Sequence, residues 1–211
     1  MHRARAFHAA TAAVTVAALV LQLVLVVQGG VVLDETKRFG LGDRLWHFVS
    51  YFTIQSNALV AVAAVMLTGQ PARDGRGFRA LRLAGVLGIS VTGVVHFTLL
   101  RPLLDLDGWD YAADKLLHMV VPTLAVLGWA LFGPRPRIDR QALAPALAWP
   151  IAYLVYTLAV GAANGWYPYP FLDVDEEGWA SVLVASVGVT AVFLVLYAGA
   201  ALVDRRAKVV P

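Results

Sequence analysis

The sequence YFTIQSNALV, residues 51–60, places four polar side chains within five positions of an otherwise apolar stretch: Thr53, Gln55, Ser56 and Asn57. A hydroxyl next to a general base can attack an ester carbonyl, and neighbouring amides or hydroxyls can donate hydrogen bonds to the oxyanion that forms. The alternative is that these groups hydrogen-bond between packed helices, at about 0.6–2 kcal/mol each. The cluster therefore supplies a candidate nucleophile, Thr53, and three candidate donors.

Three histidines lie in apolar stretches of the sequence: His47, His96 and His118. A rise of about 1.5 Å per helical residue predicts that each lies roughly 6–9 Å from the outer end of its helix, with Thr53 near 15 Å. Ionisable groups in such segments are candidates for function. For His47 we favour an interfacial position beside Trp46, and for His96 packing or lining of a pocket is at least as plausible as chemistry.

His118 is the preferred general base because Pro122 follows four residues later. Proline lacks the N–H that the His118 carbonyl would accept in a regular helix, so a bend and a small cavity are expected at this point. We therefore predict that Thr53 and His118 are catalytic. One alternative is a metal held by His47, His96 and His118, which would activate water. Another is a non-enzymatic protein that binds a lipid or small solute.

The elements that position these groups are predicted from composition. The chain has 211 residues, a mean hydropathy of +0.69, 15% charged residues and no cysteine. These values indicate a polytopic membrane protein, without disulfides or thiolate chemistry. A spanning helix needs about 20 mostly apolar residues. Six stretches meet this length, and they predict an all-α, single six-helix domain over residues 1–211: Ala6–Val27, Gly42–Thr68, Phe78–Leu100, Ala112–Phe132, Ala142–Ala162 and Trp179–Val203.

Charge predicts the orientation of the six helices. The two termini and two alternate connections hold 12 of the 17 Lys and Arg residues but only three of the 14 acids. Positive residues favour the cytoplasm, so both termini are expected on the cytoplasmic side of the cell membrane, and the candidate pocket is expected toward the outer leaflet. The pI of 9.4 is then explained by cytoplasmic basic loops rather than by nucleic-acid binding.

Three segments resemble, in order, those of the androgen-induced membrane proteins, a family that includes the androgen-dependent regulators of tissue factor pathway inhibitor. They are YFTI, DKLLHMVVP and YLVYTLAVGAANGWYPYPFL, the last spanning Tyr153 to Leu172. The resemblance implies a membrane threonine hydrolase that cleaves fatty acid esters of hydroxy fatty acids, with Thr53 and His118 in the catalytic positions. The spacing from His118 to Pro122 is one residue shorter than in the eukaryotic members.

The predicted pocket for the substrate or the oxyanion contains the three donors of the polar cluster, one histidine and three aromatic residues: Gln55, Ser56, Asn57, His96, Tyr156, Trp166 and Tyr169. Under the hydrolase interpretation we expect no cofactor and no metal, and a membrane lipid or fatty ester as the partner.

Overall fold

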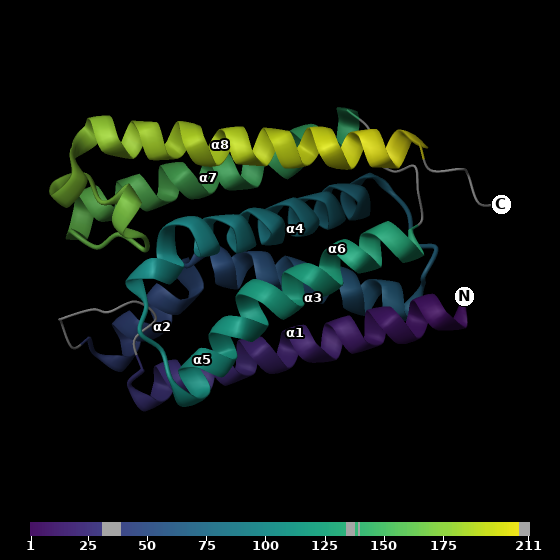
Figure 1. Cartoon of the computed structure of the whole chain (residues 1–211), viewed down its shortest axis with the longest axis horizontal. Helices are drawn as coiled ribbons and strands as arrows, with labels where there is room; N and C mark the ends of the chain where they lie inside the picture. The colour runs from purple at the N-terminus through teal and green to yellow at the C-terminus, as the bar shows by residue number, and fades with distance from the viewer. Residues whose placement is uncertain (31–38, 134–137, 139, 207–211) are drawn as a thin grey trace.

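Six long apolar helices run along the long axis of the molecule (Figure 1). The computed structural model describes residues 1–30, 39–133, 138 and 140–206. In this part of the chain the secondary structure is entirely helical, and six helical stretches are long and apolar enough to cross a membrane. They are His2–Gln28 (α1), Phe52–Gly69 (α3), Arg76–Leu103 (which begins with α4, Arg76–Val95), Gly108–Phe132, Leu143–Asn164 (within α7, Arg140–Asn164) and Val174–Arg206 (α8). The prediction of an all-α, six-helix membrane protein is confirmed.

Helix α1 begins and α8 ends at the same end of the bundle, while the short helices α2 (Leu41–Ser50) and α5 (Gly108–Lys115) lie at the opposite end (Figure 1). We call the end that holds α2 and α5 the distal end. An even number of crossings is consistent with termini on one side of a membrane. Five cations counted in the charge argument lie outside the described residues: Lys37, Arg38, Arg135, Arg137 and Lys208.

The sequence predicted one continuous helix from Gly42 to Thr68, but the structure divides this stretch into two helices. Tyr51 adopts an extended conformation (φ −72°, ψ 130°) that separates α2 from α3. The Tyr51 carbonyl accepts hydrogen bonds from the amides of Ile54 and Gln55, at 3.0 and 3.1 Å, and so starts α3. Thr53 is therefore the second residue of α3, where backbone amides have no partner within the helix.

Two π-helical turns interrupt the spanning helices near the distal end. Helix α4 continues into η1 (His96–Leu100) and then into the 3-10 turn η2 (Arg101–Leu103). Helix α5 continues through η3 (Leu116–Val120) into α6 (Val121–Phe132). The irregularity predicted beside Pro122 thus takes the form of a π-helical turn that contains His118. Such turns occur frequently at functional sites.

Helix α4 is the central element of the bundle, since it packs against α3, α6, α7 and α8. Helix α3, which carries Thr53, packs mainly against α1 and α4. Helices α7 and α8 are peripheral and carry exposed apolar side chains such as Ile151, Val184 and Val195. A surface of this kind is suited to lipid.

Gly88 marks a close approach of α4 to α7. A Cβ atom at Gly88 would lie 2.6 Å from Cζ3 of Trp149. Because the Trp149 ring must then move, we expect Gly88→Ala to destabilise the protein by about 1–3 kcal/mol. Thermal unfolding in detergent micelles measures this loss. Gly188→Ala in α8 is the control, since its Cβ would meet no atom within 4 Å, and equal melting temperatures for the two variants would contradict the packing described.

Candidate active site

Thr53 and His118 meet at the distal half of the bundle, although 65 positions separate them in sequence. The Thr53 Oγ1 atom lies 3.3 Å from Nε2 of His118. Thr53 is buried at the start of α3, and His118 is presented by the π-helical turn η3. This separation is within the reach of proton transfer between a hydroxyl and a general base in a site without substrate.

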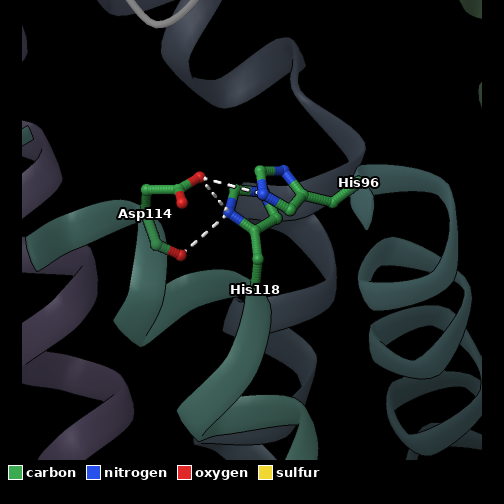
Figure 2. A group of neighbouring side chains, drawn as sticks. All are labelled: His96, Asp114 and His118. Atoms are coloured by element: carbon green, nitrogen blue, oxygen red, sulfur yellow. Dashed lines mark hydrogen bonds and ion pairs between the residues drawn. The ribbon is translucent and has the colours of Figure 1, made fainter. Parts of the chain in front are cut away.

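Asp114 lies beside Nδ1 of the His118 ring (Figure 2), whereas Thr53 lies at Nε2. Nδ1 of His118 lies 3.0 Å from Asp114 Oδ1 and 3.0 Å from the Asp114 backbone carbonyl oxygen. Both of these oxygens accept, so Nδ1 carries the proton and donates to them. Nε2 is then the acceptor that faces the Thr53 hydroxyl, which is the tautomer a general base requires.

Asp114 was not among the residues predicted for the site. Asp114 is buried in α5, four residues before His118 in DKLLH. Residues at this spacing lie on one face of a helix and can hydrogen-bond. The i, i+4 pairing of a carboxylate with the candidate base was the signal available in the sequence.

The Asp114 carboxylate is surrounded by three nitrogen-bearing side chains. Oδ1 lies 3.3 Å from His96 Nε2 as well as close to His118, and Oδ2 accepts a hydrogen bond from Lys115 Nζ at 3.3 Å. Lys115 also lies over the Tyr111 ring, 4.7 Å from its centroid. A buried carboxylate needs such compensation to remain charged inside a low-dielectric bundle.

His96 stacks face to face on His118 (Figure 2). The ring centroids are 3.9 Å apart and the planes differ by 13°. His96, Asp114 and His118 could by distance alone hold a metal, since their ligand atoms lie within 4.8 Å of one another. However, an imidazole binds a metal through a lone pair in the plane of its ring, and two nearly parallel planes 3.9 Å apart cannot both contain one ion. Metal binding would require the rings to turn.

His47 does not belong to this group, in contrast to the predicted set of three metal-ligating histidines. Its ring stacks on Trp166, with centroids 3.8 Å apart and planes within 2°. The metal-capable group found among the described residues contains His96, Asp114 and His118 but not His47. His47 is thus a packing residue that joins α2 to the segment after α7.

Tyr169 is the third polar group at Thr53. Its hydroxyl accepts a hydrogen bond from the Thr53 amide at 3.3 Å and lies 3.5 Å from Thr53 Oγ1. Tyr169 is buried and immediately precedes the 3-10 turn η4 (Pro170–Leu172). Burial raises the pKa of the Tyr169 phenol above its ordinary value, so the phenol stays protonated and can donate to an oxygen bound at Thr53.

The three candidate donors of the polar cluster have other partners. Asn57 Nδ2 donates to the Thr53 carbonyl at 2.8 Å, and Ser56 Oγ accepts from Thr92 of α4 at 3.3 Å. Gln55 Oε1 accepts from Trp149 Nε1 of α7 at 3.0 Å. Successive helical residues are about 100° apart, so these side chains point to different neighbours. Asn57 bonds within α3, whereas Ser56 and Gln55 join α3 to α4 and α7.

Tyr156 and Trp166, also predicted for the pocket, lie away from the Thr53 hydroxyl. The Tyr156 hydroxyl lies 2.7 Å from Ser50 Oγ, and its side chain is exposed. Trp166 contacts Trp46, His47 and Tyr51. Of the four predicted pocket residues outside the polar cluster, the structure brings His96 and Tyr169 to the site.

Two hollows adjoin Thr53. A hollow of about 50 Å³, which we call the polar hollow, is lined by His96, Asp110, Asp114 and His118. Its remaining wall includes the aliphatic side chains of Ile54, Leu100, Leu104, Leu106 and Leu117. An apolar cavity of about 230 Å³ lies between α3, α4, α7 and α8. Thr53, Leu100 and Tyr169 line both. The arrangement gives a hydroxyl with a base on one side, a phenol on another, and space in two directions.

Comparison with family models, with curated proteins and with solved structures found no match to this chain.

Proposed function

We propose that the protein is an integral-membrane hydrolase that cleaves an ester of a fatty acid, with Thr53 as nucleophile and His118 as general base. The observation that supports this proposal most directly is the alignment of three groups. Thr53 Oγ1 lies 3.3 Å from one nitrogen of His118, and Asp114 Oδ1 lies 3.0 Å from the other. The same order of hydroxyl, imidazole and carboxylate performs acyl transfer on unrelated folds.

In the acylation step, Thr53 Oγ1 attacks the ester carbonyl carbon while its proton passes to His118 Nε2. The carbonyl oxygen becomes an oxyanion on a tetrahedral intermediate. When this intermediate collapses, the bond to the alcohol oxygen breaks and that oxygen takes the proton from His118. The products are a free alcohol and an acyl group esterified to Thr53.

Water then completes the cycle. His118 Nε2 takes a proton from a water molecule, whose oxygen attacks the acyl-threonine carbonyl. Collapse of the second intermediate returns the proton to Thr53 Oγ1 and releases the fatty acid. Asp114 stabilises the imidazolium in both steps and keeps Nε2 directed at Thr53, so Asp114 is a positioning residue.

Tyr169 is the best-placed donor for the oxyanion, in place of the amide and hydroxyl groups that the sequence suggested. Its hydroxyl lies 3.5 Å from Thr53 Oγ1. The start of α3 adds the positive end of a helix dipole at the same point. Donors fixed before reaction stabilise developing negative charge without reorganisation.

The charge asymmetry of the loops supports an orientation in which both termini lie on the cytoplasmic side of the cell membrane. The distal end would then face outward, and a lipid would reach Thr53 from the outer leaflet.

Labelling by a fluorophosphonate tests the nucleophile, since Thr53 Oγ1 would attack phosphorus and displace fluoride. We expect Thr53→Ala to abolish labelling and His118→Ala to slow it by about 100-fold or more, because general-base assistance contributes about that much. Thr68→Ala at the end of α3 and His8→Ala near the start of α1 are matched controls, which should label at the normal rate.

Labelling that survives both site variants would overturn the proposal. Ester hydrolysis that a chelator stops and zinc restores would instead favour a metal held by the histidines. Purification with an intact bound lipid, without turnover of any ester, would favour a binding protein.

Asp114→Asn tests the positioning role. Asparagine keeps the shape of the side chain but lacks the charge that stabilises the imidazolium, so we expect kcat for an activated ester to fall by about 10²–10⁴-fold with little change in KM. Asp105→Asn in the exposed loop is the control. A loss through KM or through the melting temperature alone would indicate a merely structural residue.

The orientation is tested with single cysteines, because the natural chain has none. The loop between α3 and α4 lies at the opposite end of the bundle from the loop between η2 and α5 (Figure 1). Ala72 is exposed in the first of these loops and Asp105 in the second. In intact cells, a membrane-impermeant maleimide is expected to label Asp105→Cys but to label Ala72→Cys only after permeabilisation. The reverse pattern would place the candidate site on the cytoplasmic side.

A further inference from the structure

The two hollows that adjoin Thr53 differ in chemistry. None of the described side chains that line the apolar cavity is charged, whereas the polar hollow includes the carboxylates of Asp110 and Asp114. Because Thr53 lines both hollows, an ester carbonyl placed at Thr53 can direct one side of the ester into each hollow. The difference between the hollows therefore determines which side is the acyl chain.

The apolar cavity extends from Thr53 toward the middle of the bundle and reaches the outer surface of the bundle. Along α8 its lining runs from Ser186 to Leu194, a distance of about 12 Å at the helical rise. Two of its lining residues, Ile151 of α7 and Leu194 of α8, are 63% and 50% exposed on the outside of the bundle. An alkyl chain could therefore enter sideways from lipid, between these two helices.

The polar hollow is smaller, at about 50 Å³ against about 230 Å³, and it has an acidic lining. Asp110 in the first turn of α5 brings a carboxylate besides that of Asp114. By the same measure the polar hollow offers about a fifth of the space of the apolar cavity, which favours the smaller side of an ester there. An anionic leaving group would be repelled by carboxylates at short range in a medium of low dielectric constant, whereas hydroxyl groups could donate hydrogen bonds to them.

We infer that the substrate is a single-chain ester of a long fatty acid with a small uncharged polyol, such as a monoacylglycerol. The acyl chain occupies the apolar cavity and the polyol occupies the polar hollow. This inference rests on the proposed hydrolase function and narrows it, since a fatty acid ester of a hydroxy fatty acid carries a second long chain and a carboxylate on the alcohol side.

The first test compares two substrates with the purified protein in mixed micelles. We expect kcat/KM for monooleoylglycerol to exceed that for the palmitoyl ester of hydroxystearic acid by about tenfold or more. A preference for the hydroxystearate ester would overturn the inference and leave the hydrolase proposal intact. Absence of both turnover and fluorophosphonate labelling would instead overturn the hydrolase proposal.

The second test blocks the apolar cavity with Val189→Trp on α8. We expect the ratio of kcat/KM for p-nitrophenyl palmitate to that for p-nitrophenyl butyrate to fall by about tenfold or more, because the indole occupies the volume assigned to the distal methylenes. Val187→Trp is the matched control two residues away, since Val187 is 68% exposed and does not line the cavity.

If Val189→Trp fails to fold, as judged by its melting temperature, Leu147→Trp on the facing helix α7 blocks the same cavity. An unchanged chain-length ratio in a folded blocking variant would show that the acyl chain lies elsewhere.

Discussion

The negative charge of Asp114 is the constraint on which the arrangement of the distal half depends. A carboxylate inside a spanning helix is costly unless charges and hydrogen-bond donors surround it. Here His96 comes from the end of α4, while His118 and Lys115 come from the same helical stretch as Asp114. The contacts of the Asp114 carboxylate with His96 and His118 therefore bring the end of α4 against the stretch that links α5 to α6. The same contacts hold both imidazole rings in position.

Local breaks in regular helix then bring the hydroxyl to this framework. The extended Tyr51 starts α3 just before Thr53, and the π-helical turns η1 and η3 contain His96 and His118. A regular α-helix turns each residue by about 100°, so an extra residue in one turn redirects every side chain that follows it. The three irregular points all lie at the residues that form the candidate site, which is where departures from ideal geometry are expected.

Much of the fold was predictable because six apolar stretches of spanning length leave few alternatives in a chain of this size. Thr53 and His118 were predicted from residue type, depth and resemblance, and the structure places them together. The depth predicted for Thr53 assumed one continuous helix before it, and the break at Tyr51 removes that assumption. Asp114 was missed although the predicted stretch Ala112–Phe132 contains it, because it entered only the count of charges and was not considered as a partner for His118, four residues later. The roles of Gln55, Ser56 and Asn57 depend on which neighbour each faces, and composition does not contain that information.

The peripheral position of α7 and α8 separates two properties that many enzymes combine in one set of residues. Under the proposed function, the nucleophile Thr53, the positioning residue Asp114 and the base His118 belong to α3, α5 and η3. Much of the apolar cavity wall belongs instead to α7 and α8, whose outer faces carry exposed apolar side chains. Substitutions on these two helices would alter the length and shape of the accepted chain without touching the acid, the base or the hydroxyl. If the proposed function holds, the selectivity for the chain can therefore diverge, in nature or in the laboratory, while the proposed chemistry is retained.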